Sequence, residues 1–292
     1  MKKIISIIAL ITGVLLLSGC LGSTDLEGAE VYTTVYPIGF ITEQLYGNHS
    51  EIKSIYPSGA NAETYKLTDK QIEEYSNADL FIYNGLTDEK QITKDFINEN
   101  DRMLIIDVSY GLKYTHGIEE LWLSPNNFLM LAKNIKTNLV EYVDNKYLAE
   151  EIEKNYNELE ETISIMDADL RSIPTEALKE KKSTTLVVSS NVFKFLENYG
   201  FEVISLEDEN NLTENNLNTL KGNFKNNTYN TIIMSNTDES TDLINSLVSD
   251  YKAKIVNVDP LITLTEENKT NNKNYLTLTQ EFIDNIRNII LK

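Results

Sequence analysis

The stretch NKYLAEEIEKNYNELEETISIMDADLRSI, residues 145–173, is the longest helical pattern in the chain. Its apolar residues recur at steps of three and four, at Leu148, Ile152, Tyr156, Leu159, Ile163, Met166 and Leu170. This spacing predicts one apolar stripe along a helix about 40 Å long. We expect Pro174 to end the helix, because proline lacks the N–H that continues helical hydrogen bonding. Such a stripe either packs on the chain's own domains, the commoner case in a globular chain, or forms a dimeric coiled coil.

On both sides of this helix, short β-rich runs alternate with helical patterns. The expected strands are 31–35, 52–55, 80–83 and 103–106 before it, and 184–188, 202–206, 231–234 and 254–258 after it. The expected helices are 38–46, 69–75, 192–199, 215–224, 240–248 and 275–291. Strands that alternate with helices form parallel sheets covered on both faces. We therefore predict an α/β fold of two similar parallel-sheet domains, joined by the long linker helix, with a ligand cleft between them.

The first twenty residues have the pattern of an export signal. Lys2 and Lys3 precede an apolar run over 4–17 that is short for a membrane span, and Leu17-Ser18-Gly19-Cys20 ends it. This end resembles the lipobox of bacterial lipoproteins. The resemblance implies cleavage before Cys20, attachment of diacylglycerol to its thiol, and a protein held at the outer face of the cytoplasmic membrane. The alternative is an uncleaved anchor helix with a stray cysteine.

These patterns divide the chain into five parts. We expect a signal peptide over 1–19, a lipidated tether over 20–29, an N-terminal α/β domain over 30–142, the linker helix over 143–175, and a C-terminal α/β domain over 176–292.

Charge and cysteine content exclude several classes of function. The formal net charge is −19, and it becomes −21 when residues 1–19 are removed, because they carry two lysines and no acid. A surface with this negative charge repels nucleic acid and anionic lipid headgroups. It is consistent with cation binding or simply with solubility. Cys20 is the only cysteine, which excludes intrachain disulfides and any zinc or redox site built on cysteine.

Short motifs spread over nearly the whole mature chain resemble those of the solute-binding lipoproteins of zinc and manganese ABC importers. In order, they are Thr33-Thr34-Val35-Tyr36-Pro37, Tyr56-Pro57-Ser58-Gly59 with Tyr65 and Thr68, Asn77-Ala78-Asp79, Tyr83-Asn84-Gly85, Leu121-Trp122-Leu123-Ser124-Pro125, Ala132-Lys133-Asn134-Ile135, Tyr199-Gly200, Val258-Asp259-Pro260-Leu261 and Asn274-Tyr275-Leu276. No one of them is diagnostic alone, and the specificity lies in their order and spacing.

This resemblance implies a receptor that holds a divalent metal ion, zinc or manganese, between its domains and delivers it to an ABC permease. It also implies that the long helix limits hinge closure and that the protein acts as a monomer. The lipobox and the composition favour a Gram-positive cell surface. The family usually binds its metal with three histidines and a carboxylate or water, or with two histidines, a Glu and an Asp.

The chain departs from that pattern at most of the matched positions. Glu63 and Glu120 stand where the first two histidines are expected, and Ser190 stands at the third. Ser235 takes the place of a frequent family Glu, and Asp259 alone retains the family residue.

These replacements change the metal that the chain could hold. Carboxylates with a serine hydroxyl offer only oxygen, whereas tight zinc sites use imidazole and thiolate, so a harder ion such as Mn²⁺, Mg²⁺ or Ca²⁺ is physically reasonable. Alternatively, Glu63 and Glu120 are solvated loop residues and no metal binds. His116, four residues before Glu120, could supply an imidazole, although a surface histidine is the commoner case. His49 lies in an expected turn and is expected to be exposed.

Signs of catalysis are missing from the sequence. It contains no phosphate-binding glycine loop, no His-Glu-x-x-His helix and no nucleophile elbow. We therefore predict a receptor and not an enzyme, which captures a divalent metal for an ABC permease. The alternatives are a non-transport surface protein, adhesin-like or regulatory, that kept the scaffold and lost the metal, and a transport receptor with a different solute.

Overall fold

The computed structural model describes residues 26–62 and 64–292. The expected signal peptide, the lipidation site Cys20 and the candidate ligand Glu63 lie outside the described residues. Leu26 and Ala29, which belong to the stretch expected as tether, are buried, and the N–H of Gly28 donates to the carbonyl of His49 at 2.6 Å. The described chain is therefore packed against the first domain from Leu26 onward.

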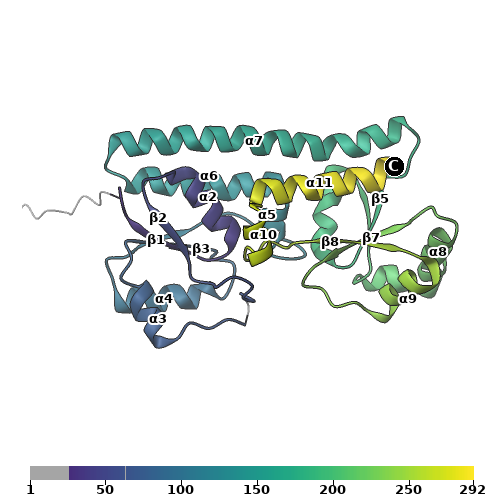
Figure 1. Cartoon of the computed structure of the whole chain (residues 1–292), viewed down its shortest axis with the longest axis horizontal. Helices are drawn as coiled ribbons and strands as arrows, with labels where there is room; N and C mark the ends of the chain where they lie inside the picture. The colour runs from purple at the N-terminus through teal and green to yellow at the C-terminus, as the bar shows by residue number, and fades with distance from the viewer. Residues whose placement is uncertain (1–25, 63) are drawn as a thin grey trace, which may run out of the picture.

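Each half of the molecule has a parallel four-stranded sheet at its middle (Figure 1). The first has the order β2-β1-β3-β4 and consists of β1 (Glu30–Thr33), β2 (Glu51–Ser54), β3 (Leu80–Tyr83) and β4 (Leu104–Asp107). The second has the order β6-β5-β7-β8 and consists of β5 (Thr185–Val188), β6 (Glu202–Ser205), β7 (Thr231–Ser235) and β8 (Lys254–Val258). In each sheet the strand order reverses beside the first strand, where open α/β sheets bind their ligands. The predicted fold of two similar α/β domains is confirmed.

Helices cover both faces of each sheet (Figure 1). One face of the first sheet carries α2 (Tyr36–Tyr46) and α6 (Pro125–Tyr142), and the other carries α3 (Asp69–Tyr75) and α4 (Glu89–Glu99). The second sheet lies between α11 (Tyr275–Leu291) on one side and α8 (Glu214–Lys225) and α9 (Asp242–Tyr251) on the other. The remaining short helices are α5 (Glu120–Leu123), η1 (Asn191–Tyr199), η2 (Glu209–Leu212) and α10 (Glu266–Thr270).

The linker helix α7 (Lys146–Lys179) spans 34 residues and runs along both domains (Figure 1). At 1.5 Å per residue it is about 50 Å long. The Asn145 side chain begins it by accepting hydrogen bonds from the N–H groups of Tyr147 and Leu148. Every residue of the predicted apolar stripe is buried, and α7 packs against α2, α6 and α11. The stripe is therefore covered by the chain's own domains, as in the first of the two alternatives.

The expectation that Pro174 ends this helix is wrong. The helix continues for five residues beyond it, to Lys179. The missing N–H costs one hydrogen bond, but the proline ring is buried, and a Cβ atom placed on Gly200 would lie 3.7 Å from Pro174 Cγ. Packing against the loop that follows η1 thus holds the helix together through the proline.

One apolar core extends through both domains. It runs from the first sheet through α2, α6 and α7 to β5, η1 and α11, and it includes Phe81, Phe128, Ile163, Phe193 and Ile286. A smaller separate core lies between the second sheet and α8 and α9, around Phe224, Ile232 and Leu247. The shared core joins the two domains along α7.

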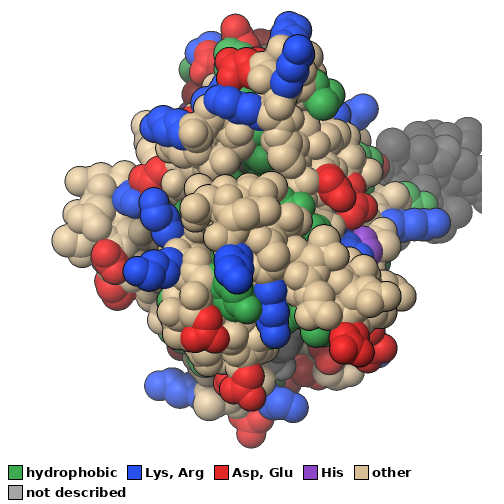
Figure 2. Space-filling model, turned by 90° about the vertical axis from the view of Figure 1, so that its right-hand side faces the viewer, with side chains coloured by type: hydrophobic (Ala, Val, Ile, Leu, Met, Phe, Trp, Pro, Cys, Tyr) green, Lys and Arg blue, Asp and Glu red, His purple; other side chains and the backbone are tan. Residues whose placement is uncertain are grey.

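Among the residues described, no helix is long and apolar enough to cross a membrane. Figure 2 shows one end of the molecule, where acidic and basic side chains are interspersed. The negative net charge is therefore not concentrated on that face.

Candidate functional site

The loops that carry three predicted site residues meet around the short helix α5. Helix α5 begins with Glu120 and contains Trp122. The indole N–H of Trp122 donates to the carbonyl of Pro260 at 2.7 Å, so α5 lies against the turn that carries Asp259. A Cβ atom on Gly117 would come within 3.0 Å of Val192 Cγ2, so the loop before α5 also contacts the residues that follow Ser190. Trp122 itself is buried.

The Glu120 side chain points into its own loop. It is 6% exposed, and its two carboxylate oxygens accept the backbone N–H groups of Thr115 (3.2 Å), His116 (2.7 Å) and Gly117 (3.3 Å). Three N–H donors satisfy much of a carboxylate's hydrogen-bonding capacity. In this structure Glu120 therefore holds residues 115–120 in a closed loop. The His116 side chain is exposed.

Ser190 and the residue after it present oxygen atoms without partners. Ser190 Oγ and Asn191 Oδ1 are buried, and neither has a hydrogen-bond partner among the residues that the structure describes. The N–H of Asn191 donates to a Glu207 carboxylate oxygen at 2.7 Å. Buried oxygens without a donor are costly, and a bound cation or water satisfies them. Ser235, by contrast, is buried, and its hydroxyl is paired with Thr237 Oγ1 at 2.9 Å.

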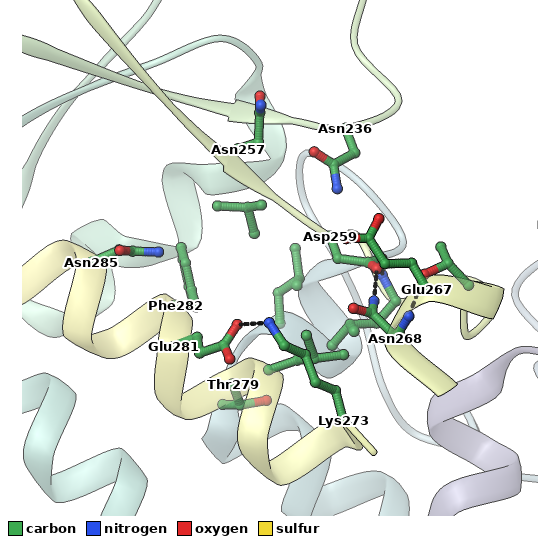
Figure 3. Close-up of a pocket in the computed structure, with 15 residues that line it drawn as sticks. Asn236, Asn257, Asp259, Glu267, Asn268, Lys273, Thr279, Glu281, Phe282 and Asn285 are labelled. Carbon is green, nitrogen blue, oxygen red and sulfur yellow. Dashed lines mark hydrogen bonds and ion pairs between the residues drawn. The ribbon is translucent and has the colours of Figure 1, made fainter. Parts of the chain in front are cut away.

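Asp259 lines a cavity of about 310 Å³ between the ends of β7 and β8, α10 and α11 (Figure 3). Its Oδ1 accepts the N–H of Leu261 and its Oδ2 accepts the side-chain amide of Asn268, both at 2.8 Å. Burial raises the pKa of Asp259 above its ordinary value, and these two hydrogen bonds act in the opposite direction. The carboxylate is thus fixed in orientation and only half-buried.

The rest of the cavity wall is polar. Lys273 forms an ion pair with Glu281 at 2.7 Å across one side. Figure 3 also shows the side chains of Asn236, Asn257 and Asn285 at the wall. Amide and carboxylate oxygens suit a hard cation or a hydrated one.

The described residues do not form a complete metal site. Within residues 26–62 and 64–292, no three side chains of His, Cys, Asp or Glu lie close enough together to hold one ion. The structure brings the loops of Glu120, Ser190 and Asp259 together, but the Glu120 carboxylate is bound to the backbone of its own loop. The assignment of these residues as ligands stays a prediction.

Comparison with known proteins identifies the chain's family. A family model described as zinc-uptake complex component A, periplasmic, matches residues 31–289. The chain belongs to this family.

Several members of the family are similar in sequence. The manganese-binding lipoprotein MntA of Halalkalibacterium halodurans is 27% identical over 73% of this chain and 74% of its own length. The zinc-binding lipoprotein AdcA of Streptococcus pneumoniae is 24% identical over 96% of this chain and 60% of its own length. The iron-binding protein YfeA of Yersinia pestis is 29% identical over 61% of this chain and 58% of its own length. Relatives that match over most of this chain thus carry names for three different metals.

Solved structures of two metal-binding lipoproteins share the fold. The metal-dependent lipoprotein YcdH of Bacillus subtilis superimposes with a TM-score of 0.73, at 21% identity, over 90% of this chain and 100% of its own. The Zn(II)-bound domain of S. pneumoniae AdcA gives a TM-score of 0.71 at 21% identity, over 90% of this chain and 99% of its own. Both confirm the two-domain architecture.

One buried acid of this family member was not predicted from the sequence. Glu89 is 5% exposed at the carboxyl end of the first sheet, where it accepts the N–H of Asn84 at 2.9 Å and the hydroxyl of Tyr56 at 3.3 Å. Burial raises the pKa of Glu89 to about 7, against the opposing effect of the Asn84 hydrogen bond. Glu89 lies five residues after Asn84, in the first turn of α4. Nothing at this position predicted burial, because an acid in the first turn of a helix is usually solvated.

The asparagines at the cavity were also missed. Asn236 and Asn257 lie at the ends of β7 and β8, and their place at strand ends was the available signal. Asn285 lies on α11, far along the chain, and no local pattern connects it with the other two.

Proposed function

We propose that the protein captures a divalent metal ion between its two domains and delivers it to an ABC permease. The family match over residues 31–289 carries this proposal. The named metal-binding relatives support it, as does the position of Asp259 at the carboxyl edge of the second sheet. In this role the protein is a carrier and not an enzyme.

The proposed ion is a hard one, with Mn²⁺ preferred to Zn²⁺. Neither histidine is placed to restore the family's ligand set: His116 is exposed, and His49 contacts Glu151 at 2.9 Å on α7. The remaining donors are the Asp259 carboxylate, the unpartnered Ser190 and Asn191 oxygens and, from the sequence, the Glu63 carboxylate. Oxygen donors favour Mn²⁺, Mg²⁺ and Ca²⁺, whereas imidazole favours Zn²⁺.

The proposal includes attachment to the membrane. Cleavage before Cys20 and its lipidation would hold the mature protein at the outer face of the cytoplasmic membrane, on a Gram-positive surface, as a monomer beside its permease. Mass spectrometry of the protein from a bacterial host tests this, since diacylglycerol adds a defined mass to a peptide that begins at Cys20.

Thermal unfolding of the full chain in detergent, after chelation and then with one metal added, tests the proposed function. A ligand at one hundred times its dissociation constant adds about 2.7 kcal/mol to the free energy of unfolding. We expect Mn²⁺ to raise the melting temperature of the wild type, and the rise to be lost in Asp259→Ala and Glu63→Ala. Asp101→Ala, at an exposed carboxylate before β4, is the matched control. No rise with Zn²⁺, Mn²⁺, Mg²⁺ or Ca²⁺ would refute metal capture.

A further inference from the structure

The cavity that Asp259 lines has room for more than a metal ion. Its volume of about 310 Å³ is at the lower end of the range for small-molecule sites, roughly 300–1,000 Å³. An ion with one or two waters would leave most of this space unfilled, because a water molecule takes up about 30 Å³. The cavity also lies at the carboxyl ends of β7 and β8, where open α/β sheets bind their ligands.

Buried apolar side chains form part of the cavity wall. Leu123 of α5, Leu261 after β8 and Phe282 of α11 line it and are all buried, and Leu278 of α11 lies beside them. A hydrated ion gains nothing from such contacts, whereas the hydrocarbon part of an organic molecule is stabilised when it leaves water. This part of the wall therefore favours a ligand that carries an aliphatic group.

Three asparagine side chains at the cavity have no hydrogen bond to any residue that the structure describes. Asn236 follows β7, Asn257 is in β8 and Asn285 is on α11 (Figure 3). Each side-chain amide can donate two hydrogen bonds and accept two. These amides can thus bind a polar molecule without breaking a contact of the folded chain.

The cavity wall also contains an ion pair that is open to solvent. Lys273 Nζ lies 2.7 Å from a carboxylate oxygen of Glu281, and the two side chains are 33% and 50% exposed (Figure 3). Exposed ion pairs contribute only about 0–1 kcal/mol, so this pair separates at little cost. A ligand with both charges can replace each partner, since its carboxylate can bind Lys273 and its ammonium can bind Glu281.

The charges at the cavity distinguish between classes of small molecule. The wall carries one cation, Lys273, and three carboxylates, those of Asp259, Glu267 and Glu281. A divalent ion at Asp259 balances this set. A simple carboxylic acid or a simple amine would then add an uncompensated charge, whereas a zwitterion would not.

We propose that the cavity binds a small aliphatic α-amino acid as a zwitterion, which presents its carboxylate to the ion held at Asp259. This inference rests on the proposed function. Within residues 26–62 and 64–292, no three side chains of His, Cys, Asp or Glu can hold one ion, so these residues leave coordination positions unfilled. A carboxylate oxygen of the amino acid suits a hard ion such as Mn²⁺ at one of them. The captured solute is then the ion together with the amino acid.

The test is a calorimetric titration of Mn²⁺ into the chelated full chain in detergent, with and without L-leucine. Leucine is the probe because it combines a zwitterion with an aliphatic side chain. Coupling between two ligands is reciprocal, so we expect leucine to lower the dissociation constant of Mn²⁺ roughly 5- to 150-fold, and Mn²⁺ to lower that of leucine by the same factor. The hydroxy acid analogue of leucine, which lacks the ammonium, and isopentylamine, which lacks the carboxylate, should leave Mn²⁺ binding unchanged.

Variants of the ion pair locate the effect. Lys273→Met and Glu281→Gln each remove one charge that would hold the zwitterion, and we expect both to abolish the effect of leucine on Mn²⁺ binding. The ratio of the two dissociation constants, with and without leucine, corrects for any direct effect of the lost charge on the ion. Lys269→Met is the matched control, because Lys269 forms a similar exposed ion pair with Glu266 at 2.9 Å outside the cavity, and it should keep the wild-type ratio.

The outcomes separate this inference from the proposed function. If the wild type binds Mn²⁺ equally well with and without leucine, the inference is overturned and metal capture stands. If leucine acts equally on the wild type and on Lys273→Met, or if its hydroxy acid analogue acts as leucine does, the cavity is not the zwitterion site. Binding of Mn²⁺ only in the presence of leucine would support both proposals. A wild type that binds no Mn²⁺ in either condition refutes the proposed function, and this inference with it.

Discussion

The indole N–H of Trp122 donates to the carbonyl of Pro260 at 2.7 Å, and this bond connects the helix of Glu120 with the turn of Asp259. Trp122 is also the only tryptophan in the chain. Its carbonyl accepts the hydroxyl of Tyr275 at 2.5 Å, and the Tyr275 ring stacks on Phe128 with centroids 3.8 Å apart. The junction of the two domains is thus built around one buried indole.

Trp122→Phe should destabilise the protein by about 1–3 kcal/mol, because it leaves the buried Pro260 carbonyl without its donor and removes part of a packed ring. Urea unfolding followed by circular dichroism measures this change in the free energy of unfolding. A variant as stable as the wild type would show that water replaces the lost donor.

Glu120→Gln should cost about 1.5–3 kcal/mol of stability, since a neutral amide oxygen accepts the N–H groups of residues 115–117 less strongly than a carboxylate does. Glu141→Gln, at an exposed position on α6, is the matched control and should have little effect. The same urea experiment compares the two variants. If Glu120→Gln instead leaves stability unchanged and abolishes metal binding, Glu120 turns toward the ion when the ion is present.

Glu89 should make stability depend on pH. Its pKa is raised from an ordinary 4.5 to about 7 in the folded protein, so the folded state keeps a proton that the unfolded state releases between these values. Stability contributed by this proton is present below pH 4.5 and is lost as the pH rises through 7, by about 3 kcal/mol in total. Glu89→Gln should remove this dependence. Unfolding free energies of both proteins from pH 4.5 to 8 measure it, and equal slopes would contradict the prediction.

Ile163→Ala should cost about 2–5 kcal/mol, because Ile163 is fully buried in the stripe of α7. Ile165→Ala provides a control on the same helix, since Ile165 is 65% exposed, and it should change stability by less than about 0.5 kcal/mol. Sedimentation velocity of the wild type accompanies the unfolding measurements. A dimer that is disrupted by Ile165→Ala, and not by Ile163→Ala, would show that α7 pairs through its exposed face and not through the predicted stripe.

Secondary structure followed closely from local patterns. The expected strands at 80–83 and 254–258 and the expected helices at 69–75 and 275–291 have the observed bounds. Alternating strands and helices leave few ways to bury both faces of a sheet. At Pro174, tertiary packing overrode the local rule that a proline ends a helix, and the predicted helix end was wrong.

The candidate site was less predictable. Asp259 could be expected at a strand end beside a cavity, because parallel strands place their carboxyl ends on one edge. The direction of the Glu120 side chain could not be expected, because it depends on three backbone N–H groups of a folded loop.

The sequence by itself determined the two α/β domains, the long helix and the family, because periodicity and the order of motifs are properties of neighbouring residues. Only the tertiary structure decided which side chains face a cavity, which carboxylates bind their own backbone, and how residues 260–275, between β8 and α11, contact the first domain. Glu89 and Tyr56, or Ser58 and Leu264, lie far apart in the chain and come into contact only when the strands pair and residues 260–275 pack on the first domain. The hydrogen bonds and pKa values of such residues depend on burial and on distances in the folded chain, and these cannot be read from a local sequence pattern.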